Sequence, residues 1–232
     1  SKLKLNRIQK ALLADIQDEL FSGKPVSNMT LKFRQGGAST FFNILHLDRT
    51  IFRPNTTTGI LADLRENLGY LFEMIRFAHE SMPVEFRPIL GSDSKSELSF
   101  PILGSKIMVS LAFKSTTLHG LHISEYAYIE QNDLQMSVGA CTPDAWITKE
   151  STANGYNHFR DEWTDRKAKG KPGVFLPWPL QEEYRDTVPD GTEIVRSEEE
   201  NMLARSMLKY GITLDDEQVL FRRRKKDELG RL

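Results

Sequence analysis

A glycine-containing stretch near the amino end of the chain has residue types that bind phosphate. Residues 30–42 read T-L-K-F-R-Q-G-G-A-S-T-F-F, in which a strand-like apolar lead is followed by Gln35-Gly36-Gly37 and an apolar helical run. A strand, a glycine loop and a helix N-terminus in this order direct backbone N–H groups at an anion. The stretch therefore predicts a phosphate-binding loop; an ordinary glycine-rich turn between a strand and a helix is the alternative.

The stretch matches half of the fixed positions of the P-loop pattern G-x-x-x-x-G-K-[ST]. Gly37 occupies the second glycine position and Ser39 the hydroxyl position, whereas Lys32 stands at the first glycine and Ala38 at the lysine. Ser39 is the predicted magnesium-binding hydroxyl. Lys32 and Arg34 are the candidates for the missing phosphate-binding cation. The predicted nucleotide-binding residues of the loop are Gln35, Gly36, Gly37, Ala38, Ser39 and Thr40.

A carboxylate ends another strand-like segment. Residues 118–125 read L-H-G-L-H-I-S-E, a predicted buried parallel strand that ends at Glu125. Open α/β folds bind ligands at the carboxyl edge of the sheet, so Glu125 is placed to polarise a water molecule for attack on a phosphate. A glutamate that begins a surface helix is the alternative. His119, His122 and Glu125 make a poor metal site, because a strand directs the two histidines to different faces.

Hydroxyl and amide side chains follow a further predicted strand. Residues 145–148 read A-W-I-T and lead into E-S-T-A-N-G at 150–155. If this strand belongs to the same sheet, Ser151, Thr152 and Asn154 line the same crevice, where they could sense the γ-phosphate of a nucleotide. A polar turn into the next helix is the alternative.

Strands and helices alternate along most of the chain, which favours a mostly parallel sheet flanked by helices. The predicted helices span residues 3–21, 39–52, 66–80, 131–140 and 156–168. The predicted strands span residues 26–33, 59–62, 118–125 and 145–148, with a hairpin at 97–111. An α/β core is predicted at residues 1–175. Gln9, on the first helix, is either an adenine-binding residue or an exposed polar one.

Two more helices are predicted in a small subdomain at residues 176–232. Ser197 and Glu200 have the spacing of a capping box, and Thr213 or Asp215 can cap the second helix. The basic run at 222–226 either touches DNA phosphates or forms a solvated helix face balanced by nearby acids.

The composition narrows the class of protein. Thirty-one basic and 32 acidic residues give a net charge of −1, so contact with nucleic acid would need a local patch. Cys141 is the single cysteine, which excludes an internal disulfide and suits a reducing cytoplasm. No signal peptide and no apolar run near the ~20 residues of a membrane span are present, so no membrane partner is expected.

Together these segments resemble the ATPase domain of the large terminase subunit of tailed bacteriophages, the motor that pumps DNA into an empty capsid. The stretch L-K-F-R-Q-G-G-A-S-T is similar to the family's variant P-loop, and H-I-S-E to its acid-bearing strand, with Glu125 in the catalytic position. S-T-A-N-G-Y-N-H-F with Trp163 resembles the coupling segment, the most specific of the matches. Residues 5–12 with Gln9 resemble the adenine-reading segment, and the C-terminal helices the linker subdomain.

The resemblance implies a P-loop ATPase that uses ATP and Mg²⁺ to move double-stranded DNA into the procapsid. Its implied partners are the portal protein, the small terminase subunit and further copies of the chain in a ring on the procapsid. The implied location is the host cytoplasm during assembly, outside the mature virion. Ser151, Thr152 and Asn154 would couple hydrolysis to movement. The family's nuclease domain is not expected within these 232 residues, which we interpret as the motor portion alone.

Three positions depart from the family pattern. Ala38 replaces the phosphate-binding lysine, which leaves charge neutralisation to Lys32 or Arg34. Ser124 stands where an aspartate usually orients magnesium, so it is expected to hold the metal through a water molecule. Lys114 lies where many relatives carry an arginine, so the candidate arginine finger is Arg65 of a neighbouring subunit, with Lys114 as its substitute.

Two other functions remain open from the sequence. A helicase-like DNA translocase would need further nucleic-acid motifs and a second motor lobe. A decayed P-loop module would serve only as a docking piece for the portal or the small terminase subunit, and the changes at Ala38 and Ser124 are what such decay would leave.

Overall fold

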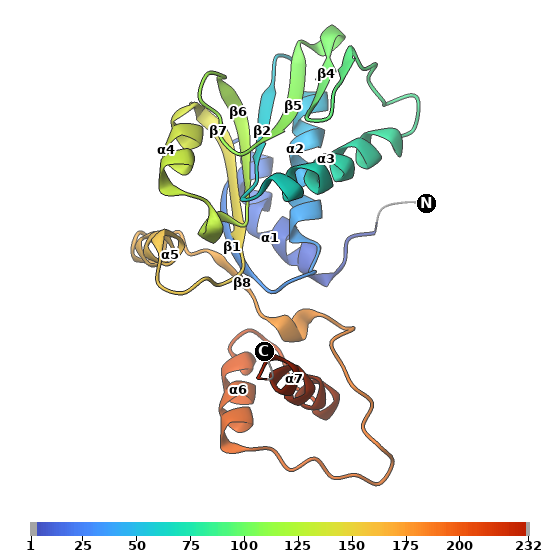
Figure 1. Ribbon diagram of the computed structural model, residues 1–232, viewed down its shortest axis with the longest axis vertical. Helices are drawn as coiled ribbons and strands as arrows, with labels where there is room; N and C mark the ends of the chain where they lie inside the picture. Colours follow the sequence, from blue (N-terminus) through green and yellow to red (C-terminus); the bar gives the residue numbers. More distant parts are fainter. Residues whose placement is uncertain (1–3, 231–232) are drawn as a thin grey trace. The chain divides into compact units, whose positions relative to one another are not determined.

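The larger part of the chain folds around one twisted sheet. The computed structural model describes residues 4–230, and only the backbone of Ser92 and Asp93. The chain divides into two units, Ser1–Phe175 and Leu176–Leu232. The described residues form an eight-stranded sheet in the order β3-β4-β5-β2-β6-β7-β1-β8 (Figure 1). Its neighbouring strands β5, β2, β6, β7 and β1 run parallel, and the β3–β4–β5 end is antiparallel. The predicted mostly parallel α/β architecture is confirmed.

The strands and helices follow the predicted alternation closely. The strands are β1 (Ser27–Lys32), β2 (Thr57–Leu61), β3 (Ser92–Asp93), β4 (Glu97–Phe100), β5 (Ser105–Ser110), β6 (Leu118–Ser124), β7 (Cys141–Ser151) and β8 (Val174–Leu176). The α-helices of this part are α1 (Arg7–Ser22), α2 (Ala38–Phe52), α3 (Arg65–Glu80), α4 (Gln131–Gly139) and α5 (His158–Ala168).

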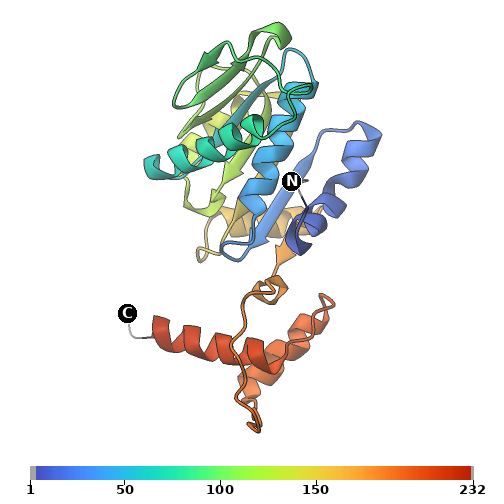
Figure 2. The same ribbon diagram turned by 90° about the vertical axis from the view of Figure 1, so that its right-hand side faces the viewer.

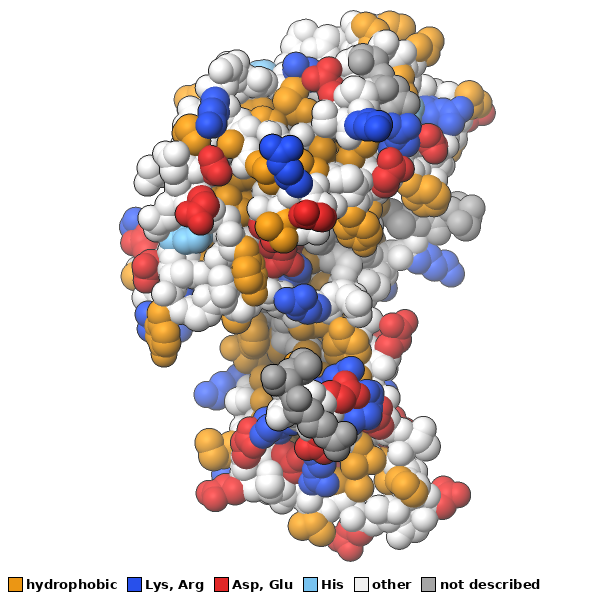
Figure 3. Space-filling model, in the orientation of Figure 1, with side chains coloured by type: hydrophobic (Ala, Val, Ile, Leu, Met, Phe, Trp, Pro, Cys, Tyr) orange, Lys and Arg blue, Asp and Glu red, His pale blue; other side chains and the backbone are white. Residues whose placement is uncertain are grey.

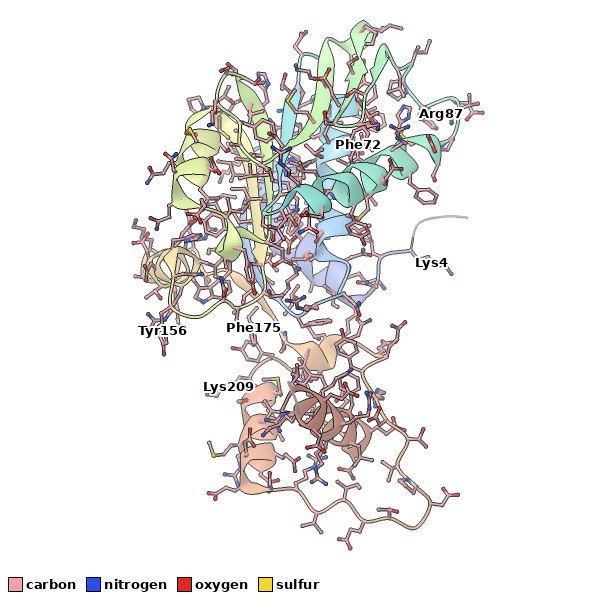
Figure 4. The ribbon with its side chains drawn as sticks, viewed as in Figure 1. Lys4, Phe72, Arg87, Tyr156, Phe175 and Lys209 are labelled. Carbon is pink, nitrogen blue, oxygen red and sulfur yellow. The ribbon has the colours of Figure 1, made fainter. Side chains whose placement is uncertain are left out.

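Apolar side chains fix the helices on the two faces of the sheet. Helices α1, α2 and α3 cover one face, and α4 and α5 cover the other (Figures 1 and 2). Neighbouring residues of β2 serve opposite faces, as strand geometry requires: Ile60 packs with α2 and α3, whereas Leu61 packs with α4 and α5. Phe72 of α3, labelled in Figure 4, belongs to the same apolar cluster as Ile60 and is 1% exposed.

Several boundaries differ from the prediction by a few residues, and the reasons are clear for β7 and α5. Strand β7 begins at Cys141 rather than at Ala145, and its register against β6 shifts between Leu118 and Gly120. The irregular region contains Pro143, which lacks a backbone N–H for the strand ladder. The proline is the reason that the sequence did not predict residues 141–144 as strand. Helix α5 begins at His158 because Asn157 caps it, accepting a hydrogen bond from Phe159 N.

The second unit contains α6 (Glu198–Leu208) and α7 (Asp216–Leu229). The predicted capping box of Ser197 and Glu200 is confirmed, and Asp215 rather than Thr213 caps α7. The basic run on α7 is paired with acids of the same unit, which fits the solvated-face interpretation. These ion pairs are Arg222–Glu199, Arg223–Glu200, Arg224–Asp186, Lys225–Glu228 and Lys226–Glu199.

The described part of the chain has a surface of mixed charge (Figure 3). On the face in Figure 3, lysine and arginine side chains are interspersed with aspartate and glutamate. Within residues 4–230, no helix combines the length and apolar character that a membrane span requires.

The surroundings of two glycines, one in β2 and one in α3, predict opposite effects on stability when each is replaced by alanine. A Cβ at Gly59 would lie 2.7 Å from the buried Phe113 ring, so Gly59→Ala should destabilise the protein by roughly 1–3 kcal/mol through overpacking. Gly69, in α3, has no atom within 4 Å of such a Cβ, so Gly69→Ala should stabilise by about 0.5–1 kcal/mol. Urea unfolding followed by circular dichroism compares the two. A neutral Gly59→Ala would mean that Phe113 is free to move aside.

Candidate nucleotide site

Three adjacent parallel strands bring the predicted site residues to one edge of the sheet. Strand β7 lies between β6 and β1, and all three run in the same direction. In this register Ser124 pairs with Glu150, and Thr30 pairs with Glu150 from the other side. The carboxyl ends of the strands therefore meet beside the N-terminus of α2, which is where open α/β folds bind ligands.

The glycine loop has the backbone of an anion-binding turn. Gly37 is the N-cap of α2 with φ +80°, and no side-chain hydrogen bond caps this helix end. A Cβ at Gly37 would lie 3.1 Å from Gln9 Nε2, so both the backbone conformation and the space favour glycine. Gln35 also has a positive φ, 62°. The predicted strand–loop–helix is confirmed, and its helix presents N–H groups and the positive dipole end at the sheet edge.

An ammonium group bridges two carboxylates at this edge. Lys32 Nζ lies 2.8 Å from Glu125 Oε1 and 2.9 Å from Glu150 Oε2. The side chains of Lys32, Glu125 and Glu150 are 8%, 25% and 0% exposed. Buried charges of this kind are tolerated only when they are paired, so each group depends on the others. The structure thus brings together Lys32 and Glu125, which are far apart in sequence.

Glu150 is a site residue that the sequence analysis missed. The Ser39 hydroxyl donates to Glu150 Oε1 at 2.7 Å, and the Ser124 hydroxyl donates to the same oxygen at 2.8 Å. The two hydroxyls expected to face magnesium thus converge on one carboxylate. The sequence shows an acid directly before the S-T-A-N-G segment, but the face of the strand on which this acid lies depends on strand register.

Glu125 is held in an uncommon backbone conformation. Its φ is 53°, in the left-handed region that residues other than glycine seldom adopt. Glu125 Oε2 accepts hydrogen bonds from Thr152 N at 3.2 Å and from Thr152 Oγ1 at 3.4 Å. Its other carboxylate oxygen binds Lys32. Such local strain persists where surrounding contacts enforce it, and it is frequent at functional sites.

The predicted coupling residues bind the segment that follows Glu125. Ser151 Oγ accepts a hydrogen bond from Ala127 N at 3.1 Å, and Asn154 Nδ2 donates to Ala127 O at 3.1 Å. Together with Thr152, they connect the end of β7 to residues 125–127. The three side chains therefore act on the backbone that carries Glu125.

A neutral histidine closes the buried side of the site. His122 is fully buried, and its Nδ1 lies 2.9 Å from Thr148 Oγ1. Burial, assisted by the charge of Lys32, lowers the pKa of His122 to about 3, so the ring adds no positive charge beside Glu150 at neutral pH. His119 is engaged elsewhere and accepts a hydrogen bond from Thr57 N. Among the described residues, no group of three or more His, Cys, Asp and Glu side chains has the geometry of a metal site.

Two predicted nucleotide-binding side chains have defined neighbours. Gln9 is buried and donates from Nε2 to Gly37 O at 3.2 Å, while its Oε1 accepts from Asn6 N. It also lines a cavity of about 190 Å³ between α1 and α2, together with Leu5, Phe41 and Ile44. Gln9 therefore lies beside the loop instead of being exposed. Thr40 Oγ1 donates a hydrogen bond to Met74 Sδ at 3.3 Å, so its hydroxyl is engaged with α3.

Three predicted cations take no part in the contacts described above. Arg34, in the loop, is exposed. Arg65 is exposed at the start of α3, directly after β2 and therefore at the carboxyl edge of the sheet. Lys114 is exposed in the connection from β5 to β6. Their predicted roles in phosphate binding or as an arginine finger remain predictions.

Solved structures of phage terminases share this fold. No protein-family model and no curated protein matches the chain. The large terminase of bacteriophage HK97 matches 100% of this chain over 48% of its own, with a TM-score of 0.63 and 15% identity. The large terminase of a thermophilic bacteriophage, in complex with ADP, matches 74% of this chain over 45% of its own, with a TM-score of 0.56 and 14% identity. The chain has the fold of a phage large terminase ATPase domain.

The match confirms the expected fold at low sequence identity. A mutant of the ATPase domain of the Thermus phage P74-26 large terminase covers 69% of this chain over 70% of its own, with a TM-score of 0.50 and 16% identity. The chain spans less than half the length of the HK97 terminase and of the thermophilic-phage terminase that contains ADP. The P-loop ATPase architecture that the sequence resemblance implied is therefore correct.

The charge arrangement predicts that Lys32 is essential for stability. Lys32→Ala should lower the free energy of unfolding at pH 7 by roughly 3–5 kcal/mol, because it leaves the buried Glu150 carboxylate without its cation. The loss should be smaller in Lys32→Ala/Glu150→Gln, because the second substitution also removes the buried negative charge. Urea titrations at pH 7 compare the two variants with the unaltered chain. Equal destabilisation in the single and double variants would contradict the charge-pairing account.

Proposed function

We propose that the chain is the ATPase motor domain of a viral large terminase, which hydrolyses ATP to drive double-stranded DNA into a procapsid. The observation that carries this proposal is the bridge of Lys32 to Glu125 and Glu150, at 2.8 and 2.9 Å, beside the N-terminus of α2. Structures of the thermophilic-phage terminase, which has the same fold, contain ADP or ATP-γ-S. They support a nucleotide as the ligand of this edge of the sheet.

Lys32 is the proposed replacement for the P-loop lysine. Its ammonium is already at the sheet edge beside the glycine loop, whereas Arg34 is exposed. When phosphates bind at the loop, Lys32 can exchange its contact with the partly exposed Glu125 for one with a phosphate oxygen, so that one charge-assisted contact replaces another. The backbone of residues 36–40 and the dipole of α2 supply the remaining attraction. The apolar cavity lined by Gln9 lies next to the loop and suits the adenine ring.

Ser39 and Ser124 are the residues proposed to hold magnesium, Ser124 through a water molecule. Their hydroxyl oxygens point at a common atom, Glu150 Oε1, from 2.7 and 2.8 Å. Oxygen donors beside bound phosphates are the ligands that Mg²⁺ prefers, so the residues present fit the ion. When bound, magnesium would neutralise charge on the phosphate oxygens.

Glu125 is the proposed general base. Its carboxylate is 25% exposed, so it can reach water as well as Lys32. Attack of water on the γ-phosphate breaks the bond from the γ-phosphorus to the bridging β-phosphate oxygen, so that ADP leaves and inorganic phosphate forms. The proton that the water loses would be accepted by Glu125 Oε1 once Lys32 has turned to the phosphates. Thr152 holds the second oxygen of the carboxylate and so fixes its orientation. Through Thr152, Ser151 and Asn154, the state of Glu125 would reach the loop that leads to α5.

Assembly into a ring is part of the proposal. An arginine finger typically contributes about 10³–10⁵ in rate, and the candidates are Arg65 of a neighbouring subunit and Lys114. Arg65 is exposed at the carboxyl edge of the sheet, where a neighbour's nucleotide could be reached. The isolated chain is then expected to bind ATP and hydrolyse it slowly. Portal protein, small terminase subunit and DNA are the proposed partners, on the procapsid in the host cytoplasm.

Hydrolysis should depend on Glu125. Glu125→Gln should lower single-turnover hydrolysis of ATP by about 10²–10⁴-fold, because an amide cannot accept the proton, and it should leave nucleotide affinity within a few-fold. Quenched-flow assays with labelled ATP measure the rate, and calorimetry measures the affinity. The exposed Glu130→Gln, at the N-cap of α4, is the matched control. Unchanged turnover in Glu125→Gln would remove Glu125 from this role.

Nucleotide binding should stabilise the native chain. ATP-γ-S with Mg²⁺ at about 100 times its Kd should add about 2.7 kcal/mol to the unfolding free energy by mass action. Gly37→Ala should reduce this effect, because a Cβ strains the loop and approaches Gln9 to 3.1 Å, whereas Arg34→Ala should largely keep it. Thermal melts with and without ligand measure the shift. No shift in the unaltered chain at millimolar ligand would favour the docking-module function.

A further inference from the structure

The carboxylate of Glu150 has surroundings that strand packing alone does not explain. The side chain of Glu150 is 0% exposed. It lies on the same face of β7 as Thr148, a buried position where strands usually carry uncharged side chains. Removing a carboxylate from water costs several kcal/mol before any partner is counted. A charge kept at such a position is a candidate for a functional role.

The local charge balance leaves room for another cation. Lys32 supplies one positive charge between the carboxylates of Glu125 and Glu150. If Lys32 turns to the phosphates of a nucleotide, Glu150 requires a replacement cation. A divalent cation that accompanies the nucleotide would meet this requirement.

The register of the sheet places Glu150 next to the position that lacks an acid. Ser124 and Glu150 are paired residues of β6 and β7, so they are neighbours across one strand spacing of about 4.8 Å. The Ser124 hydroxyl donates to Glu150 Oε1 at 2.8 Å. The carboxylate of Glu150 therefore lies next to the hydroxyl of Ser124, although it comes from the adjacent strand. The Ser39 hydroxyl of α2 meets the same oxygen at 2.7 Å.

We propose that Glu150 supplies the carboxylate of the magnesium site, in place of an acid at position 124. Ser39 and Ser124 complete the protein side of the site, which takes the divalent cation of a bound nucleoside triphosphate. One carboxylate with hydroxyl, water and phosphate oxygens is a usual ligand set for Mg²⁺ in nucleotide sites. This inference rests on the proposed function, because the phosphates are part of the ligand set.

Calorimetric titration with ATP-γ-S, in EDTA and in Mg²⁺, isolates this role. The measured quantity is the ratio of the two affinities, here called the magnesium ratio. Glu150→Gln should lower the magnesium ratio at least about tenfold while changing the affinity in EDTA by no more than about threefold. Glu162→Gln is the control, because Glu162 is likewise a glutamate paired with a lysine, Lys149, although it is only partly buried, and it is expected to leave the ratio unchanged.

A second substitution tests the geometry of the proposal. Glu150→Gln/Ser124→Asp returns a carboxylate to the paired position on β6 and should recover much of the magnesium ratio. Thermal melts without ligand establish that each variant is folded. If Glu150→Gln is not folded, Glu150→Asp keeps the charge beside Lys32 but withdraws it by one methylene, and it should still lower the ratio.

The outcomes separate this inference from the proposed function. An equal loss of affinity in EDTA and in Mg²⁺ for Glu150→Gln would mean that Glu150 is only the counter-ion of Lys32, and would overturn the inference. An unchanged magnesium ratio would overturn it as well, while leaving the nucleotide site intact. No binding by the unaltered chain in either condition would overturn the proposed function and this inference with it.

Discussion

The contact on which the rest of the site depends is the ammonium of Lys32 between the carboxylates of Glu125 and Glu150. It joins the ends of β1, β6 and β7, and it compensates charges that the sheet edge would otherwise exclude. A cation shared by two acids has a weaker hold on each of them than a cation paired with one. The three charges are paired in this structure, and the proposed function requires an incoming phosphate to rearrange them.

The two departures from the P-loop pattern make physical sense together. Ala38 removes a cation from the first turn of α2, and Lys32 supplies one from the strand that enters the loop. Ser124 removes an acid from β6, and Glu150 supplies one from the strand beside it. Each lost charge is matched by a charge of the same sign at the same edge. That matching argues against decay of the site, because decay would remove charges without replacing them.

The sequence predicted the elements and the chemistry of single positions, but it could not predict what depends on register. Periodicity located β1, α2 and β6, and hence the loop and Glu125. Glu150 was not predicted, because a shift of one residue in strand register decides whether an acid near the strand end faces the site or the opposite side of the sheet. The burial of Gln9 was equally hidden, since it follows from how α1 packs beside the loop. The predicted finger, Arg65 or Lys114, requires a neighbouring subunit that no intrachain pattern describes.

The contacts of Glu125 suggest how a chemical event at the sheet edge would reach the outer helix. Thr152 holds one carboxylate oxygen while Lys32 holds the other, so if Lys32 turned to a bound phosphate, as proposed, the carboxylate would keep its contacts with Thr152 alone. The backbone just beyond Glu125 is bound by Asn154 and by Asn157, which donates to Ala127 O at 2.9 Å. Because Asn157 also caps α5, a shift of residues 125–127 changes the anchorage of that helix. Glu125, the left-handed residue proposed as the base, is therefore connected through these contacts to the start of α5, so phosphate release would act on both.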